Sequence, residues 1–252
     1  MLTRPTLTEK DVSDFGRDGY LIVRGAFPVE QMNAVAAWTD ELLAMPEESG
    51  KHWVYHEPSL KGDGENLVSR IENIGPYHPG FRQLSDALKA PVGQLIGEEA
   101  VLFKEKINFK MPGGDGFKPH QDSQAGWDRY ADFFVSVLVT IDAATEENGC
   151  LEICAGHHKQ GLYTSWQPLT DEDMTDMDFV SVPTEPGDLI FFDCYAPHQS
   201  QPNMSDRTRR IYFATFNRLS AGDHLEQYYA DKFESYPPDI DRQPNREYVY
   251  RV

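Results

Sequence analysis

The pattern of apolar and polar residues changes character near residue 100. Before that point, apolar residues recur at helical spacing in "PVEQMNAVAAWTDELLAM" (28–45) and in "FRQLSDALKAPVGQLIG" (81–97). This spacing predicts two amphipathic helices. A proline interrupts a helix because it lacks an amide donor and clashes with the preceding turn, so we expect the second helix to be broken or kinked around Pro91.

The N-terminal segment carries helix boundary signals of its own. "LTEKDVSDFGRDG" offers Thr8 as an N-cap, followed by acidic residues in the first turn, and predicts a helix that ends at Gly16 or Gly19. The apolar run "YLIVRGAF" (20–27) is typical of a strand. Residues 51–80 are aromatic but show no regular period, and we expect them to be irregular.

After residue 100 the sequence consists of short runs rich in Val, Ile, Phe and Tyr, separated by Gly, Pro, Asn and Asp. These runs predict strands over 100–111, 132–142, 149–156, 178–184, 187–197 and 209–219. Many short strands preceded by helices indicate a mainly β fold with flanking helices, whose core is a double-stranded β-helix of the jelly-roll or cupin-like type.

No repeat, linker or break in composition divides the chain. We therefore expect one domain over 1–252, with a helical part over about 1–98, a β-roll core over about 99–220 and a C-terminal tail over about 221–252.

Composition and charge narrow the class of partner. The formal net charge is -18, which argues against nucleic acid, because phosphate binding needs clustered Lys and Arg. No apolar run approaches the roughly 20 residues of a membrane span, and the N-terminus lacks the apolar core of a signal peptide. Three cysteines, Cys150, Cys154 and Cys194, are too few for a disulfide framework. We expect a cytoplasmic protein without membrane or nucleic-acid partners, as a monomer or homodimer.

The candidate chemistry lies in two segments. In "KPHQDSQAGW", His120 and Asp122 point to the same side if the segment is extended. His198 follows the apolar strand "DLIFFDCY" in a similar position. Two His and one carboxylate on one face form the triad that holds Fe(II) and leaves positions open. Arg209, eleven residues further on at the start of a strand, is expected inside the barrel, where a buried guanidinium must find an anion.

Together these segments resemble the phytanoyl-CoA dioxygenase (PhyH) family of Fe(II)/2-oxoglutarate-dependent oxygenases. The resemblance rests on "FGRDGYLIVRGAFP", "KINFKMPGGDGFKPHQD", "DAATEENGCLEICAGHHKQG" and "PGDLIFFDCYAPHQSQPNMSDRTRRIYFATF", and it covers roughly residues 8–220. The C-terminal tail is similar to tails of a bacterial subgroup that acts on small polar metabolites.

The resemblance implies an iron site, a co-substrate site and O2 as second co-substrate. The implied iron ligands and catalytic residues are His120, Asp122 and His198. Arg209 is implied to bind the distal carboxylate of 2-oxoglutarate with a hydrogen bond from Ser200, and Asn108 is expected near the co-substrate. Since the carboxylate of Asp122 is present where related halogenases lack it, hydroxylation is favoured over halogen transfer.

Candidate substrate-binding residues lie on both sides of this site. The segment after the first His contributes Gln124, Trp127 and Tyr130. Lys104, Lys106 and Asn108 alternate along one strand, so all three face inward or all three face solvent. Arg70 in "SRIENI" either pairs with an anionic substrate or lies solvated at the end of a helix.

The predicted function is hydroxylation of an unactivated C–H bond in a small polar metabolite, with release of succinate and CO2. Aminoethylphosphonate is one candidate substrate. Desaturation or cyclisation in a natural-product pathway would use the same triad and remains an alternative. A second alternative is a non-catalytic metal-binding β-roll that acts as a sensor or scaffold.

Overall fold

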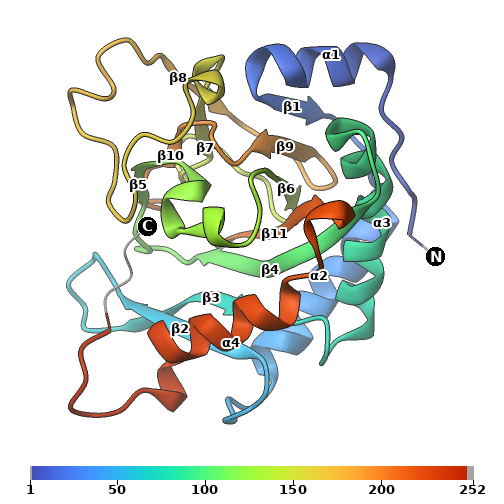
Figure 1. Ribbon diagram of the computed structural model, residues 1–252. Coiled ribbons are helices and arrows are strands. Elements are labelled where there is room, and N and C mark those ends of the chain that lie inside the picture. Colours follow the sequence, from blue (N-terminus) through green and yellow to red (C-terminus); the bar gives the residue numbers. More distant parts are fainter. Residues whose placement is uncertain (1, 249–252) are drawn as a thin grey trace.

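A computed structural model describes residues 2–248 and contains two antiparallel β-sheets flanked by helices (Figure 1). The larger sheet has the strand order β1-β9-β6-β11-β4-β3-β2, and the smaller has the order β5-β10-β7-β8. The larger sheet consists of β1 (Tyr20–Val23), β2 (Trp53–Pro58), β3 (Asn66–Glu72), β4 (Ala100–Lys110), β6 (Phe134–Thr140), β9 (Leu189–Asp193) and β11 (Arg209–Arg218). The smaller consists of β5 (Phe117–His120), β7 (Leu151–Cys154), β8 (Phe179–Val182) and β10 (His198–Ser200).

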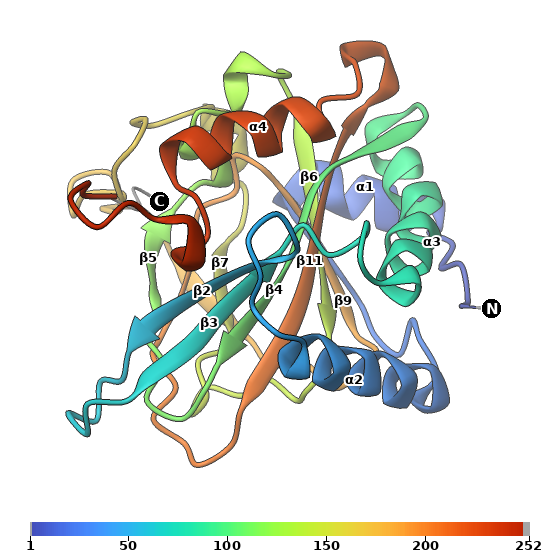
Figure 2. The same ribbon diagram turned by 90° about the horizontal axis from the view of Figure 1, so that it is seen from below.

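The two sheets enclose one part of the core, and the helices enclose another. Apolar side chains of the larger sheet, such as Leu138 and Phe192, pack with Leu151, Ile153 and Val182 of the smaller sheet. On the opposite face of the larger sheet, a second cluster joins strand residues to the helices α2 (Val29–Ala44) and α3 (Pro79–Ile96). Figure 2 shows α2 and α3 on the side of the larger sheet that is remote from β5 and β7.

The first helix, α1 (Glu9–Asp18), begins and ends as its sequence predicts. Thr8 Oγ1 accepts a hydrogen bond from the amide of Asp11, whose carboxylate accepts one from the amide of Thr8. The helix ends at Gly19, with φ 82°, and not at Gly16. A Cβ atom at Gly19 would lie 2.4 Å from the ring of His158, so glycine is required there both by the backbone and by the close approach.

The prediction of an irregular segment over 51–80 is wrong, because this segment forms β2 and β3 and extends the larger sheet. The helix α4 (Leu225–Ser235), in the segment treated as a tail, covers these strands, as the orange-red helix of Figure 1 shows. Trp53 packs edge-on against Tyr229 of α4, with ring centroids 5.1 Å apart. Because side chains on both faces of β2 find partners, the strand lacks the alternation that identifies a half-exposed strand.

We expected the second helix to be broken or kinked around Pro91; the break is wrong, since α3 is continuous from Pro79 to Ile96. Pro91 is buried, and its neighbours Leu88 and Val92 are completely buried in the core below. The packing of this apolar face offsets the hydrogen bond that proline cannot donate.

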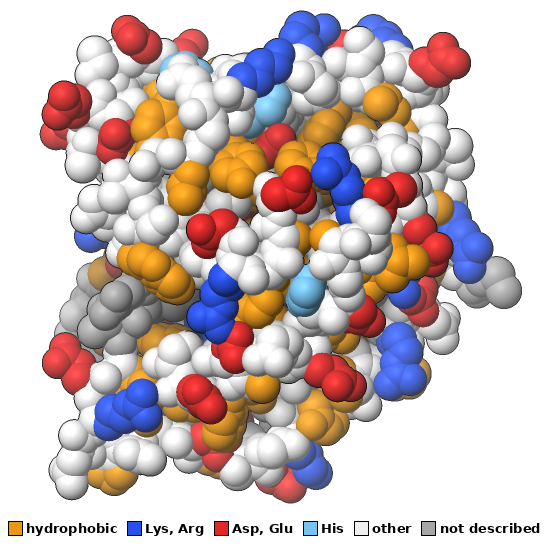
Figure 3. All heavy atoms as spheres, in the orientation of Figure 1, with side chains coloured by type: hydrophobic (Ala, Val, Ile, Leu, Met, Phe, Trp, Pro, Cys, Tyr) orange, Lys and Arg blue, Asp and Glu red, His pale blue; other side chains and the backbone are white. Residues whose placement is uncertain are grey.

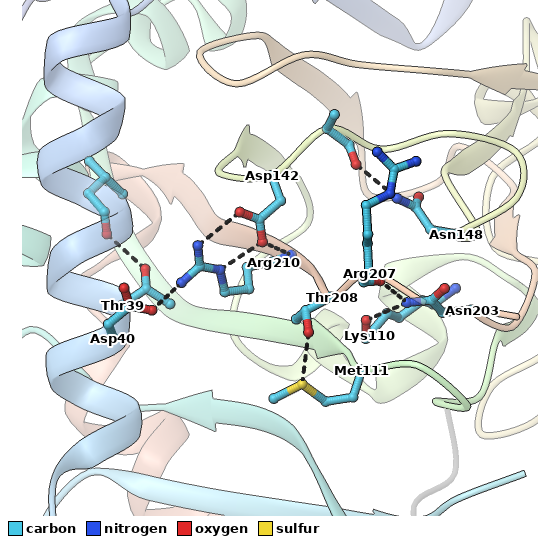
Figure 4. Close-up of polar contacts among 12 residues, drawn as sticks. Thr39, Asp40, Lys110, Met111, Asp142, Asn148, Asn203, Arg207, Thr208 and Arg210 are labelled. Atoms are coloured by element: carbon cyan, nitrogen blue, oxygen red, sulfur yellow. Dashed lines mark hydrogen bonds and ion pairs between the residues drawn. The ribbon is translucent and has the colours of Figure 1, made fainter. Parts of the chain in front are cut away.

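Arg210 connects the helical layer to the end of β6. Its Nε and Nη2 donate to Asp142 at 2.7 and 2.9 Å, and Nη1 donates to Asp40 of α2 at 2.5 Å (Figure 4). Because successive side chains of a strand alternate, this contact turns the preceding residue, Arg209, toward the space between the sheets.

The acidic residues are spread over the surface and do not gather in one patch on the face shown in Figure 3. Figure 3 shows acidic side chains scattered over one face among basic and apolar ones. Within residues 2–248, none of the helices combines the length and the apolar character needed to cross a membrane.

Candidate active site

The two histidines meet where β5 and β10 pair. His120 and His198 are register partners in this antiparallel pair, and their ring centroids are 4.3 Å apart. Nδ1 of His120 lies 2.7 Å from the carbonyl oxygen of Lys118, and Nδ1 of His198 lies 3.0 Å from that of Ala196. Since a carbonyl only accepts, each Nδ1 carries the proton and each Nε2 presents a lone pair. This is the tautomer in which imidazole binds a metal.

The third ligand candidate, Asp122, lies just after β5 on a turn. The strand ends at His120, and Asp122 opens a 3-10 turn over Asp122–Ala125, so the condition of an extended segment, under which both side chains point to one side, does not hold for Asp122. The turn still brings the carboxylate to the histidines, because one ligand atom from each of the three residues lies within 4.8 Å of the others.

One hydroxyl group holds the Asp122 carboxylate, and a second hydroxyl contacts the first. Ser136 of β6 donates to Asp122 Oδ2 at 2.6 Å, and its Oγ lies 2.9 Å from Oγ1 of Thr215, its register partner on β11. The sequence did not identify Ser136 or Thr215. Only the pairing of β6 with β11 places them beneath the turn that carries Asp122.

The charges in the site favour a metal cation. Burial lowers the pKa of His198, and burial together with His198 lowers the pKa of His120, so both rings are neutral at pH 7. Burial alone would raise the pKa of Asp122, but His198, Lys104 and other neighbouring bases hold it below its usual range. Two neutral imidazoles and one carboxylate are a donor set for Fe(II), and these three residues fit that ion.

Arg209 lies in the same cavity with part of its hydrogen-bonding capacity unused. The residue is 3% exposed, Nη1 donates to the carbonyl oxygen of Gly149 at 2.8 Å, and Nε is buried without a partner. Burial lowers the pKa of Arg209 to about 10, so the guanidinium stays charged at pH 7. A buried, charged and incompletely bonded guanidinium fits the carboxylate of a co-substrate.

Lys110 and Ser200 form the wall next to Arg209. Lys110 is the register partner of Arg209, and its Nζ donates to Ser200 Oγ at 2.8 Å. Burial, with a smaller contribution from Arg209, lowers the pKa of this amine to about 6, so Arg209 supplies the fixed positive charge. Gly149 closes the wall, where a Cβ atom would lie 2.0 Å from the carbonyl oxygen of Gln201.

The alternating residues of β4 face the cavity and not solvent. Arg70 and Glu72 of β3 lie directly opposite Asn108 and Lys106, so all of these side chains share one face of the sheet. The Asn108 Oδ1 atom is buried without a partner. The cavity is lined by Lys104, Lys106, Asn108, Phe117, His120, Asp122, Ala125, Trp127, Ser136, Leu138, Leu151, His198, Gln199, Ser200, Arg209, Phe213 and Thr215.

Three of the candidate substrate residues lie outside this lining. Gln124 is completely buried and donates to the carbonyl oxygens of Thr164 and Gln167, so its side-chain amide binds backbone groups and does not face the cavity. Tyr130 donates to Asp231 at 2.7 Å. Arg70 is buried on β3 and not at the end of a helix, with Nε 2.8 Å from Glu72. Trp127 and Lys106, in contrast, line the cavity.

Comparisons with known proteins agree with the geometry of the site. The family model "Phytanoyl-CoA dioxygenase (PhyH)" matches residues 15–211. The chain is 36% identical to a 2-aminoethylphosphonate dioxygenase from an uncultured bacterium, HF130_AEPn_1, over 96% of this chain and 93% of that protein. It is 37% identical to a methylphosphonate hydroxylase from Gimesia maris, over 92% of this chain and 88% of that protein.

Solved structures confirm the predicted fold class. EctD from S. alaskensis with 2-oxoglutarate and 5-hydroxyectoine superimposes with a TM-score of 0.74 at 22% identity, covering 86% of this chain and 78% of that chain. The 2-oxoglutarate-dependent epimerase SnoN gives a TM-score of 0.70 at 21% identity, covering 95% and 92%. Because the family model spans most of the chain and two relatives exceed 30% identity over nearly its full length, the resemblance is confirmed, and the chain belongs to the phytanoyl-CoA dioxygenase (PhyH) family of Fe(II)/2-oxoglutarate-dependent oxygenases.

Proposed function

We propose that this Fe(II)/2-oxoglutarate-dependent dioxygenase hydroxylates a small organophosphonate at the carbon bonded to phosphorus. One observation carries the proposal: a three-residue metal site and a buried, incompletely bonded Arg209 line the same cavity. A metal-binding scaffold has no use for such an arginine, whereas a dicarboxylate co-substrate needs it at the end remote from the metal.

In this proposal His120, Asp122 and His198 hold Fe(II) through Nε2 atoms and a carboxylate oxygen. The Arg209 guanidinium and the Ser200 hydroxyl bind the distal carboxylate of 2-oxoglutarate, and Asn108, whose Oδ1 is buried without a partner, lies beside the co-substrate. Bound iron would supply the chemistry by which O2 and 2-oxoglutarate give succinate and CO2, with one oxygen atom entering succinate and the other a C–H bond of the substrate.

The residues of the chain contribute position and exclusion of water. Arg209 and Ser200 fix the orientation of the co-substrate by holding one end of it, which reduces the entropic cost of reaching the reactive geometry. Ser136 holds the Asp122 carboxylate through its hydrogen bond at 2.6 Å. Trp127 and Phe213 supply apolar walls that keep water from the reacting carbon.

The substrate class is supported by the two relatives of 36% and 37% identity, both named for phosphonates. Methylphosphonate has a single carbon, so its hydroxylation takes place next to phosphorus. The likeness to the epimerase SnoN, at 21% identity, bears on fold alone and favours no other reaction.

The direct test is incubation of the purified protein with Fe(II), 2-oxoglutarate and O2 in the presence of single phosphonates. We expect succinate and an equimolar 1-hydroxyphosphonate, detected by phosphorus NMR and mass spectrometry. Asp122→Ala and Arg209→Ala should remove most of both products. Succinate at the level of the blank without enzyme, across a panel that also contains amines and amino acids, would contradict the proposal.

A further inference from the structure

Four basic side chains lie near one carboxylate, Glu72, on the face of β3 and β4 that also carries the cavity residues Lys104 and Lys106. Glu72 is 2% exposed, and although burial alone would raise its pKa, nearby cations hold that pKa at about 2. Those cations are Lys232, Arg70, Lys104 and Lys106. Four basic side chains thus act on one carboxylate in a protein whose overall charge is -18.

The Glu72 carboxylate forms ion pairs with two of these cations. Arg70 Nε lies 2.8 Å from Glu72 Oε1, and Lys232 of α4 contacts Glu72 Oε2. Lys106 lies directly opposite Glu72 across the strands, but within residues 2–248 it forms no ion pair within 4.0 Å. The charge of Lys106 is thus left for a group that enters the cavity.

The surroundings of Lys104 and Lys106 suit an anion near the metal. Both side chains line the cavity and act electrostatically on Asp122. Lys104 Nζ lies 4.0 Å from the ring centroid of Trp127, and Lys106 Nζ lies 5.1 Å from that of Phe213. These aromatic walls exclude water, and in such a site an ammonium binds an anion more strongly than in solution.

Resting on the proposed function, we infer that Lys104 and Lys106 form the subsite that binds the phosphonate group of the substrate. Arg70 and Lys232 position this subsite by neutralising Glu72, the only carboxylate that faces it among the described residues of β3 and β4. A phosphonate held by two ammonium groups on β4 places its α-carbon beside the metal ligands, which is the carbon that the proposed reaction oxidises.

The test uses the variants Lys104→Met and Lys106→Met, which keep the volume of the side chain and remove its charge. Lys106→Arg keeps the charge, and Lys89→Met removes an equal charge from the surface of α3, where Lys89 pairs with Asp86. Binding of methylphosphonate, 2-aminoethylphosphonate and inorganic phosphate is measured by calorimetry, without O2, on protein loaded with Mn(II) and 2-oxoglutarate. Binding of 2-oxoglutarate is measured separately.

We expect Lys106→Met and Lys104→Met each to weaken binding of phosphonate about 10-fold to 100-fold, as loss of a charge-assisted hydrogen bond does. Affinity for 2-oxoglutarate should change less than about twofold, Lys106→Arg should restore much of the phosphonate affinity, and Lys89→Met should resemble the unmodified protein. Unchanged phosphonate affinity in both variants, or an equal loss of 2-oxoglutarate affinity, overturns the inference.

The binding measurements with inorganic phosphate distinguish a failure of this inference from a failure of the proposed function. If the unmodified protein oxidises no phosphonate but binds phosphate in a manner that depends on Lys104 and Lys106, the oxyanion subsite stands and the proposed substrate is wrong. If phosphonates are oxidised with unchanged affinity in both lysine variants, the proposed function stands and the subsite is wrong.

Discussion

Lys110 Nζ donates a hydrogen bond to Ser200 Oγ at 2.8 Å, and this contact determines in which direction the Ser200 hydroxyl can donate its own hydrogen bond. The same amine contacts the carbonyl oxygens of Gln201 and, at 3.4 Å, Gly149. Because the Ser200 oxygen accepts from Lys110, the serine proton is free to point toward a carboxylate bound by Arg209.

We therefore predict that Lys110→Met raises the KM for 2-oxoglutarate about tenfold, since the Ser200 hydroxyl loses the partner that orients it. Ser200→Ala should have an effect of similar size. The double variant should be no worse than the more severe single one, because both changes remove the same hydrogen bond. Steady-state kinetics with 2-oxoglutarate as the varied component measure all three, and fully additive effects would mean that Lys110 binds the co-substrate directly.

The sequence predicted that His120, Asp122 and His198 come together and that Arg209 lies inside the fold, because chemistry restricts the residue types and their order along the chain. It could not decide which way Lys104, Lys106 and Asn108 face, since alternation along β4 is compatible with both faces. The register with β3, which pairs Arg70 with Asn108, decides this. That register joins residues almost forty positions apart and leaves no local pattern.

The same limit explains why β2, β3 and α4 were not predicted. Each depends on the others for its buried face, as the contact between Trp53 and Tyr229 illustrates. Tertiary packing stabilises these elements more than local propensity does. The strands predicted between 100 and 219 are richer in β-branched residues and were recognised at their correct places in the chain.

Gln124 fastens a loop to the turn that carries Asp122. Its side chain accepts from the Gln121 amide at 2.7 Å and donates to the carbonyl oxygens of Thr164 and Gln167. We predict that Gln124→Glu loosens residues 161–170, because a carboxylate oxygen would then face two carbonyl oxygens. Hydrogen exchange of the loop amides should accelerate roughly tenfold or more, as expected for losing a buried hydrogen bond.

A matched control for this variant is Gln94→Glu. Gln94 makes the same kind of clamp on the N-terminal segment, accepting from the amide of Leu7 and donating to its carbonyl oxygen, both at 2.9 Å. Exchange in 161–170 should not respond to this change. Equal acceleration in both variants would indicate a global loss of stability and not a local clamp.

The raised pKa of the buried Glu105 carboxyl leads us to predict that the free energy of unfolding depends on pH. It is 3% exposed, its Oε1 accepts from the amides of Ile74 and Gly75 at 2.6 and 2.8 Å, and burial raises its pKa from 4.5 to about 7. The folded state therefore binds the proton more tightly than the unfolded state does. The stabilisation is complete below pH 4.5 and is lost as the pH rises through 7, an effect of roughly 3 kcal/mol at about 1.36 kcal/mol per pKa unit.

Glu105→Gln removes this titration and keeps an oxygen for the two amides. The free energy of unfolding, measured by urea denaturation of metal-free protein between pH 5 and 8, should decline less steeply in the variant. The variant should be the more stable protein at pH 8. Parallel curves would show that Glu105 has a normal pKa in the folded state.

The hydrogen bond from Ser136 to Asp122 should govern metal affinity. Ser136→Ala leaves all three ligands in place but removes the donor that orients the carboxylate, and partners of this kind typically change metal affinity about 10-fold to 100-fold. We expect a loss of that size in competition with a chelator. Ser85→Ala is the matched control, because Ser85 is also buried and hydrogen-bonded, to Tyr212 at 2.6 Å, on the face of the sheet that packs on α3. Both variants should lose similar stability. Only Ser136→Ala should release metal more readily, since of the two serines only Ser136 contacts Asp122. If the metal affinity fell equally in both variants, the effect would come from general loosening of the sheet.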